Sequence, residues 1–507
     1  MAAALAAAEA GAQVVLIEKC AQLGGTTSIS VGSFTAACTA FQRAKGIEDN
    51  PAWHDEDMGK FASHWEIHNN AGLRALFARH APETLNWLTS LGVEFYGPSA
   101  EPPNRVARMH NVVPNARAYI SVLWRAAMRR GVVVLTRHRA EKLVREDGGR
   151  VVGVRVHRFD GRTLMLRARR GVVLAAGDYS SGDSIKRQHL PPDIAAVEGI
   201  NSNATGDGHR LAAEAGAELV NMDLVYGPEI RFVSPPRLPF NQSLPANPLL
   251  ARLLGSVMGL VPRPILRRIQ QRLLVTWQRP ETAILRDGAI LVNRHGQRFA
   301  DETAHPELAV PGQPQGIAYI VFDRALAGKY SRWPHFISTA PDIAYAYIQD
   351  YRRLRPDVYA EAATLASLAR QRGMQQHSLE DSVQSYNQAA RGLAADAFGR
   401  KFFGPALQDS PYYALGPVRS WLVTTEGGVR IDEQMQVLDH KGRVLPGLYA
   451  GGCNGTGGVV IAGHGLHIAW AFTSGRLAGR NAALNFQKAE HTPTDSGDTR
   501  KIGLHHE

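Results

Sequence analysis

The sequence has few cysteines and no long apolar run. Its three cysteines, Cys20, Cys38 and Cys453, lie far apart and none belongs to a C-x-x-C pair, so neither a disulfide framework nor a metal site is expected. No uninterrupted apolar stretch reaches the roughly 18 residues of a membrane-spanning helix. The alanine-rich start lacks the basic segment of a signal peptide and predicts a helix instead. The cytoplasm is therefore the expected compartment.

The charge balance does not indicate a nucleic-acid partner. Lysine and arginine number 57 against 46 acidic residues, a net charge of +11. The arginines are spread along the chain without a known nucleic-acid-binding module, so no such partner is expected. With 507 residues, 44% of them hydrophobic, the chain is long enough for two domains, or for one domain with a large insertion.

The first residues have the pattern of the second half of a βαβ unit. Residues 2–10 favour helix, Gly11 suits a helix C-cap, and Val14 to Ile17 predict a short buried strand that ends in Glu18. An acidic residue at that point binds the ribose in dinucleotide-binding folds, about 20 residues beyond a glycine-rich loop. We therefore expect the true start to lie upstream of Met1. An ordinary αβ pair is the alternative interpretation.

A glycine and hydroxyl segment follows Glu18 and suggests a cofactor. Small residues from Gly24 to Ser28, with Gly32 beyond, would let the backbone approach a pyrophosphate. The pattern E-K-x(4)-G-G-T-T-x-x-S-x-G resembles the FAD-binding domain of the fumarate reductase and ketosteroid dehydrogenase flavoprotein superfamily. The resemblance implies an α/β fold, in which a Rossmann-like, three-layer FAD-binding domain with a β-meander carries an inserted α+β cap domain.

The resemblance extends along most of the chain. Residues 132–177 predict a strand, a meander with hairpin turns at 147–149 and 160–161, and a buried strand. The expected domains are 1–228 and 416–486 for FAD, 229–415 for the cap, and a disordered tail at 487–507. In the cap, residues 289–299 resemble the family's hairpin, and 379–400 its helix ending in F-G-R. The residues that the resemblance places at FAD are Glu18, Lys19, Gly24, Gly25, Thr26, Thr27, Ser28, Gly32, Ala140, Ala176, Gly177, Asp207, Gly452, Cys453, Asn454, Gly465, Leu466, His467 and Ile468.

The FAD segments also predict how the flavin is held and whether it is covalently attached. The family usually has Glu or Asn where this chain has Cys453, so ribityl contacts are expected to pass to Asn454. No histidine lies in the glycine-rich segment near Ser28, where covalently flavinylated relatives carry one, so non-covalent FAD is expected. The residues after Gly465 predict a helix whose N-terminus would stabilise a reduced, anionic flavin.

The resemblance also implies oxidation or reduction of a C–C bond beside a carbonyl or carboxylate. Fumarate reductases hold a dicarboxylate with histidines and arginines, but this chain has Gly227, Thr424 and Ile461 at three of those positions, and residues 301–306 supply no counterpart of the proton-donating arginine. Ketosteroid dehydrogenases share the G-x-G turn at 463–465 but place a tyrosine at the position of Ile461. A small dianion is therefore not the expected substrate.

The leading hypothesis is an FAD-dependent dehydrogenase or enone reductase for a hydrophobic carbonyl compound, steroid-like or alicyclic. Candidate acid/base residues are Tyr226, His305 and His464, although each could instead be a packed or solvent-facing residue. Glu229 and Arg231 could form a structural ion pair or orient a substrate carbonyl. Reduction of another α,β-unsaturated acid, or a degenerate flavoprotein without turnover, remain alternatives. The electron donor or acceptor is left open.

One cap segment allows two interpretations. Residues 247–278 combine leucine, isoleucine, valine and methionine with five arginines, and Pro262 and Pro264 interrupt the segment. They predict either a pair of amphipathic cap helices with solvated arginines or a peripheral contact with the inner face of a membrane.

Overall fold

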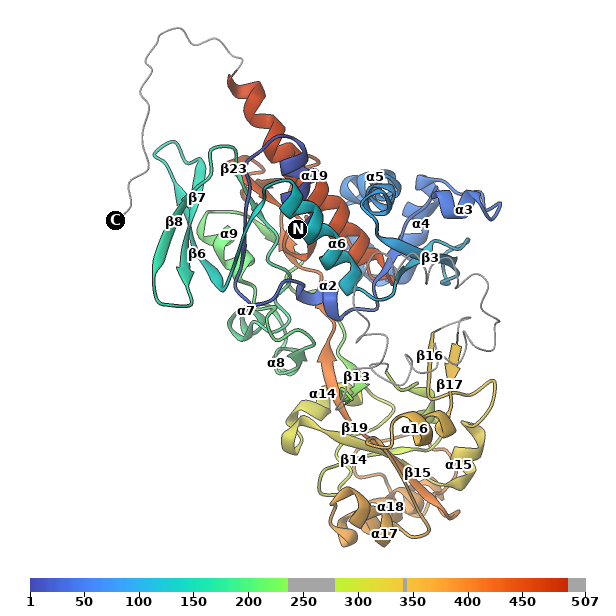
Figure 1. The fold of residues 1–507 in the computed structure, drawn as a ribbon. Helices are drawn as coiled ribbons and strands as arrows, with labels where there is room; N and C mark the ends of the chain where they lie inside the picture. The colour runs from blue at the N-terminus through green and yellow to red at the C-terminus, as the bar shows by residue number, and fades with distance from the viewer. Residues whose placement is uncertain (236–278, 341–343, 491–507) are drawn as a thin grey trace.

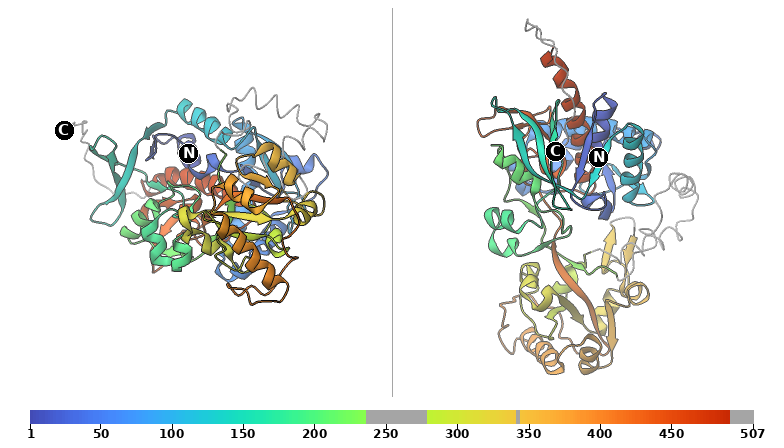
Figure 2. Two further views of the ribbon diagram at one scale, coloured as in Figure 1. Left: turned by 90° about the horizontal axis from the view of Figure 1, so that it is seen from below. Right: turned by 60° about the vertical axis from the view of Figure 1, so that its left-hand side comes forward.

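The chain folds into two lobes. The computed structural model describes residues 1–235, 279–340 and 344–490. One lobe contains the beginning and the end of the described chain, and the other contains its middle (Figure 1). Strands β13 (Glu229–Phe232) and β19 (Tyr412–Leu422) lie where the lobes meet, and the right-hand view of Figure 2 shows the same two lobes.

The first lobe has the predicted βαβ character, but its parallel strands form two separate sheets. Helix α1 (Ala2–Glu9) leads through Gly11, with φ 78°, into β1 (Val15–Glu18), which pairs in parallel with β5 (Val133–Thr136). Strand β9 (Val172–Leu174) pairs with β23 (Val444–Ala450), which also pairs with β22 (Gln436–Leu438). Within the described residues no strand joins β1 to β9.

The expectation that the strand before Glu18 is buried is wrong. Val15 is 47% exposed, and the other three residues of β1 are only half-buried. The physical reason is that β1 pairs with a neighbouring strand on one edge only. A two-stranded parallel sheet is covered less completely than a larger one, so the side chains of β1 stay partly exposed.

The meander forms as predicted. Strands β6 (His138–Arg145), β7 (Val151–Arg158) and β8 (Thr163–Arg167) make a three-stranded antiparallel sheet. Gly149 and Gly161 have φ of 81° and 86° in the two turns, a conformation that glycine adopts without strain. The D-G signals therefore located both hairpins.

Helix α19 (Leu466–Glu490) is the spine of this lobe. It packs against α1 and α5 (Ala71–Ser90) in Figure 1, and Trp470, Phe77 and Tyr119 are fully buried around it. Small residues let α1 approach closely, since a Cβ on Gly479 would lie 2.0 Å from the Ala3 carbonyl oxygen. The helix continues to Glu490, past residue 487 where a disordered tail was expected, and the rest of that tail lies outside the described residues.

The cap is a mixed sheet with helices on it. Strand β19 runs through it beside β15 (Ala318–Phe322), β13, β18 (Tyr359–Ala362) and β10 (Glu198–Gly199), while β14 (Ile290–Asn293) pairs with β15. Residues 198–199 come from the part of the chain expected in the FAD domain, and β19 crosses the expected boundary at 415. The two domains are thus joined through one sheet.

Two cap motifs of the sequence have structural roles. Residues 290–298 form the expected hairpin, since β14 is followed by a turn and a bridge from Val292 to Arg298. Helix α18 (Gln376–Ala390) ends before F-G-R, so the prediction of a helix to residue 400 is wrong. Arg400 instead joins Arg298 on the fully buried Glu302, with N–O distances of 2.8 Å. This ion-pair network holds the cap together.

Further helices and strands complete the two lobes. In the first lobe they are α2 (Gly25–Ile29), β2 (Ser33–Thr35), α3 (Ala40–Arg43), α4 (Pro51–Phe61), β3 (Glu94–Ser99), β4 (Met109–Val113), α6 (Arg117–Arg129), α7 (Asp183–His189), α8 (Pro192–Ala195), α9 (Asp207–Glu214), β11 (Leu219–Val220), β12 (Val225–Tyr226), β20 (Thr424–Thr425) and β21 (Gly428–Val429). In the cap they are α13 (Ala283–Arg286), α14 (Pro306–Ala309), α15 (Arg324–Lys329), β16 (Ser338–Ala340), β17 (Ala344–Ala346), α16 (Ile348–Leu354) and α17 (Leu365–Arg372).

Candidate functional site

A cluster of charged side chains connects the end of β1 to the start of α9. Lys19 donates to Thr205 Oγ1 at 2.6 Å and to Asp207 Oδ2 at 2.8 Å, and Arg139 donates to the other Asp207 oxygen at 2.8 Å. Burial would raise the pKa of Asp207, but the hydrogen bonds from Lys19 and Arg139 outweigh it and lower this pKa below its usual value. Glu18 accepts the Cys20 N–H at 2.8 Å. The structure thus brings together three of the expected cofactor residues, Glu18, Lys19 and Asp207.

The return of the chain after β23 adds Asn454 to this region. Asn454 is fully buried, its Oδ1 accepts the Ala176 N–H at 3.4 Å, and its Nδ2 is buried without a hydrogen-bond partner in the described part of the chain. A Cβ on Gly208 would lie 1.9 Å from Asn454 Oδ1, so only glycine fits beside it. An orphaned buried donor is costly unless a ligand satisfies it, which fits the expected ribityl contact.

Two glycines of the expected cofactor site have open space beside their backbone. Gly25 and Gly177 have φ of 50° and 82°, and a Cβ on either would meet no atom within 4 Å. The residues from Gly25 to Ser28 lie in α2, where Thr26 Oγ1 accepts from Asn201 at 2.9 Å. The backbone is therefore exposed where an extended anionic cofactor needs close approach. Of the other expected cofactor residues, Gly24 is the N-cap of α2, Gly32 precedes β2, and Ala140 lies on β6 opposite Val156.

The glycine-rich turns before α19 are held in place by side chains of that helix and of β2. Gly452 donates to Ser474 Oγ at 2.8 Å and accepts from Trp470 at 3.2 Å. A Cβ on Gly465, whose φ is 74°, would lie 2.7 Å from Thr35 Oγ1. In the first turn of α19, Leu466 is buried in the core and the partly buried Ile468 packs against it. The backbone N–H groups of this turn carry the positive end of the helix dipole.

Tyr226 lies at the edge of this turn. Its strand β12 pairs with β20, opposite Thr424, and its ring lies edge-on to His467 with centroids 6.5 Å apart. Burial, together with the charges of Glu229 and Glu101, raises the pKa of Tyr226 despite Arg279 and Arg231. Tyr226 is therefore a hydrogen-bond donor that keeps its proton at neutral pH.

His464 is paired with a glutamate that the sequence did not single out. Glu101 Oε1 accepts the His464 backbone N–H at 2.9 Å and lies 2.6 Å from its Nδ1. The Glu101 side chain is 9% exposed and the His464 side chain is 68% exposed. The pair joins a buried carboxylate to an imidazole open to solvent.

His467 forms a second pair of this kind. Its Nε2 lies 2.7 Å from Oε1 of Glu426, which is fully buried. Burial alone would lower the pKa of His467, but the charge and the hydrogen bond of Glu426 raise it above its ordinary value. Asp178 adds a nearby carboxylate whose pKa is raised by burial, although hydrogen bonds with Ser180 oppose the rise. Burial also raises the pKa of Cys453 to about 12, so its thiol stays protonated.

His305 lies apart from the other two catalytic candidates. Its side chain is 81% exposed on the cap, where Nδ1 lies 3.0 Å from Glu307 Oε1. Among the described residues no contact connects it to Tyr226 or His464. Glu229 and Arg231 do form an ion pair, at 2.8 Å, and Arg279 lies 3.4 Å from the same carboxylate.

The positions expected to replace a dicarboxylate clamp carry no charge. Gly227 has φ 106°, and a Cβ there would lie 2.9 Å from the Trp421 carbonyl oxygen, so a larger side chain is excluded locally. Ile461 is fully buried, and Thr424 is buried with its hydroxyl 3.5 Å from Asp178 Oδ2. Residues 301–306 contribute Glu302 to the cap network described above.

Glu101, Glu426 and Asp178 were missed by sequence reasoning. Glu426 lies inside T-T-E-G-G, and Asp178 directly follows the expected Ala176 and Gly177, so an acidic residue in a glycine motif was an available signal. Glu101, which precedes two prolines, carried no such signal because its partner is 363 positions away.

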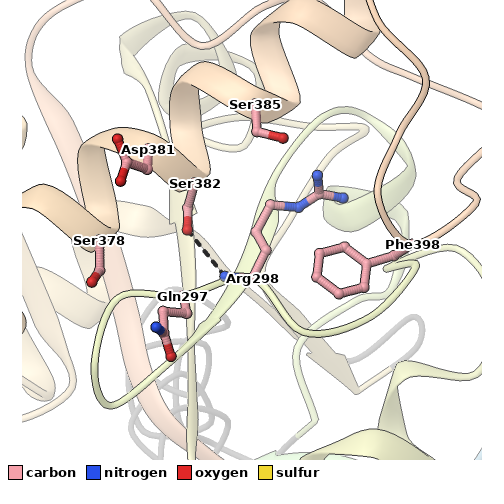
Figure 3. A pocket seen from close by; sticks show the side chains of 7 residues that line it. All are labelled: Gln297, Arg298, Ser378, Asp381, Ser382, Ser385 and Phe398. Atoms are coloured by element: carbon pink, nitrogen blue, oxygen red, sulfur yellow. Dashed lines mark hydrogen bonds between the residues drawn. The ribbon is translucent and has the colours of Figure 1, made fainter.

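A separate hollow of about 350 Å³ lies on the cap (Figure 3). Its polar groups are largely satisfied, since Ser382 accepts the Arg298 N–H at 3.0 Å and donates to Gly296 at 2.8 Å. It belongs to the packing of α18 and adds nothing to the cofactor residues. Its lining residues are Gln297, Arg298, Ser378, Asp381, Ser382, Ser385 and Phe398.

Neither a membrane-crossing helix nor a metal centre is found in the described segments. None of the helices there combines the length and the apolar character that crossing a bilayer requires. No cluster of His, Cys, Asp or Glu side chains in the same segments is arranged to hold a metal ion. The basic and apolar segment 247–278 lies outside the described residues.

Comparison with known proteins places these segments in a family. The FAD binding domain family matches residues 1–228 and 260–462. A probable fumarate reductase of Shewanella frigidimarina is 29% identical over 493 residues, which cover 95% of this chain and 72% of that protein. A vinyl phenol reductase of Lactiplantibacillus plantarum is 24% identical over 508 residues, which cover 95% of this chain and 94% of that protein.

Solved structures share the fold. The open conformation of a flavocytochrome c3 fumarate reductase matches 96% of this chain and 76% of its own, at 28% identity and a TM-score of 0.71. A 3-ketosteroid-Δ4-(5α)-dehydrogenase from Rhodococcus jostii is 23% identical, with a TM-score of 0.57 and coverage of 95% and 94%, and shows the fold alone.

Proposed function

Since the chain belongs to the FAD binding domain family and is an FAD-dependent oxidoreductase, we propose that it oxidises or reduces a CH–CH bond beside the carbonyl of a neutral, hydrophobic substrate. The proposed substrates are steroid-like or alicyclic ketones and enones. Bound FAD supplies the two-electron chemistry of such a reaction. The contribution of the protein is to bind the cofactor, orient the carbonyl and move a proton.

The cofactor residues fit FAD. Glu18 would accept the adenosine ribose hydroxyls, with Gly177 beside the ribose and with Lys19 held nearby by Asp207. The backbone around Gly25 would lie along the pyrophosphate, and Asn454 would donate its orphaned Nδ2–H to a ribityl hydroxyl. We propose that FAD is not covalently bound, because no histidine lies between Gly24 and Gly32. Denaturation in acid should release all of the yellow cofactor, and colour retained on the protein would contradict this.

One observation supports the substrate class: among the described residues, the positively charged groups around Tyr226 already have carboxylate partners. His464 is paired with Glu101, His467 with Glu426, and both arginines, Arg231 and Arg279, with Glu229. A dicarboxylate would have to displace these pairs and would meet buried carboxylates, which repel it. A neutral carbonyl needs only a hydrogen-bond donor.

Tyr226 and His464 are the side chains proposed to act on the substrate. The Tyr226 hydroxyl, protonated at neutral pH, donates a hydrogen bond to the carbonyl oxygen and so stabilises the negative charge that develops there. His464 takes a proton from the substrate in dehydrogenation and returns it in reduction. His305 ranks behind them because it is exposed and lies apart on the cap.

Anaerobic mixing of the purified FAD-loaded protein with cyclic ketones, enones and fumarate tests the substrate class. We expect saturated ketones to bleach the oxidised flavin, or enones to reoxidise the chemically reduced one, while fumarate does neither. Turnover with fumarate alone would overturn the neutral class. A flavin that responds to none of these compounds would favour a flavoprotein without turnover.

A second candidate is reduction of an α,β-unsaturated acid other than fumarate. It is favoured by the likeness to fumarate reductases, and the vinyl phenol reductase favours the neutral class instead. Monocarboxylic enoic acids in the same assay separate the two. The electron donor or acceptor is a further partner to be found by offering NADH, quinones and a cytochrome in turn. A membrane contact through residues 247–278 remains a proposal, to be tested by liposome flotation of the chain with and without that segment.

A further inference from the structure

Glu101 is brought to the site by the fold alone. It follows β3 in a loop at one side of the first lobe, and its partner His464 precedes α19 at the other end of the chain, 363 positions away. Two contacts meet on the same oxygen, because Oε1 accepts the backbone N–H of His464 and also lies 2.6 Å from its Nδ1. A single carboxylate oxygen thereby fixes the backbone and the ring of one residue.

The backbone of His464 is held from a second side as well. Thr35 Oγ1 donates to the His464 carbonyl oxygen at 2.8 Å, and the Thr35 N–H donates to the Gly465 carbonyl oxygen at 3.3 Å. Gly465 is so close to β2 that a Cβ would lie 3.0 Å from the backbone carbon of Ser33. The residue is therefore rigidly placed although its ring is open to solvent.

The second carboxylate oxygen of Glu101 argues against a purely structural role for this residue. Glu101 Oε2 is buried, and in the described chain it has no hydrogen-bond partner. A buried charged oxygen without a partner is unfavourable, whereas a neutral glutamine would meet the backbone N–H equally well. A carboxylate is useful there if a positive charge forms next to it, and the adjacent imidazole is the group that can become positive.

From this geometry we propose that Glu101 is the positioning residue of His464. Its carboxylate holds the ring in the tautomer with hydrogen on Nδ1, so that Nε2 is the nitrogen that accepts the substrate proton and later returns it. When Nε2 is protonated, the negative carboxylate stabilises the imidazolium. The inference rests on the proposed function in taking His464 as the proton-transfer group.

The test uses the FAD-loaded protein and three variants, E101Q, H464Q and the double variant. E101Q keeps the size and one acceptor but loses the charge. We expect it to lower kcat about 10- to 100-fold with KM changed less than about 3-fold. In the H464Q background, E101Q should cause no further loss, because it acts through a ring that is absent. Glu83→Gln is the matched control, since Glu83 Oε2 lies 3.2 Å from Nδ1 of His80 on the surface of α5.

A spectroscopic readout separates this inference from the proposed function. Ring nitrogen NMR of histidine-labelled protein, with H464Q to assign the signal, should show hydrogen on Nδ1 in the parent protein and mixed tautomers in E101Q. Hydrogen on Nε2 in the parent protein, or an additional loss of kcat when E101Q is added to H464Q, would overturn the positioning role. If no neutral enone turns over, the proposed function fails, and the tautomer alone decides the role of Glu101.

Discussion

The contact between α1 and α19 gives the sharpest stability prediction. Gly479→Ala would place a Cβ 2.0 Å from the Ala3 carbonyl oxygen and 2.6 Å from its carbonyl carbon. Both atoms belong to backbone and cannot rotate away. Gly475→Ala, one turn earlier on the same face, would place its Cβ 3.4 Å from Ala2 Cβ, an ordinary contact. The two substitutions are chemically identical and differ only in this distance.

The magnitude follows from two opposing terms. Alanine is favoured over glycine inside a helix by about 1 kcal/mol, and this term applies to both variants. Overpacking costs about 1–3 kcal/mol, with the upper end expected when backbone must move. Gly479→Ala should therefore lower the free energy of unfolding by about 2 kcal/mol, and Gly475→Ala should raise it by up to about 1 kcal/mol.

Urea unfolding of the FAD-loaded parent and the two variants, followed by circular dichroism, measures the difference. We expect the unfolding midpoint of Gly479→Ala to lie clearly below that of Gly475→Ala. If Gly479→Ala were as stable as Gly475→Ala, the close approach of α1 to α19 would be wrong.

Two further substitutions test the site. Asp207→Asn removes the negative charge that pairs with both Lys19 and Arg139, and it should weaken FAD binding about 10-fold in a fluorescence titration. The control is Asp160→Asn, at an exposed turn of the meander. An unchanged Kd for Asp207→Asn, or an equal loss of affinity in the control, would refute the prediction. Because the pKa of His467 is raised above 6.5, its pair with Glu426 stabilises the fold fully below that pH, and this stabilisation is lost as pH rises through the raised pKa. The parent should therefore lose more stability than Glu426→Gln when urea unfolding is compared at about pH 6 and about pH 8, and equal losses would contradict the pairing.

Local signals were sufficient for much of the first lobe. The D-G turns predicted both hairpins of the meander because a turn of this kind needs φ above zero, and glycine supplies it wherever the strands lie. The helix of residues 2–10 and the one after Gly465 were likewise predicted from propensity and capping. The burial of residues 14–17 was not, because burial depends on which strand lies alongside.

The sequence by itself determined the family, the cofactor and the order of the elements, because these are written in short motifs and local propensities. Only the tertiary structure decided which charges meet. Glu101 and His464, 363 positions apart, share one hydrogen-bonding oxygen, and Glu426 reaches His467 across 41. Such pairs leave no periodic pattern in a sequence, because a carboxylate and an imidazole interact only when they lie close together in space. The packing of β2, β3 and α19 sets that distance.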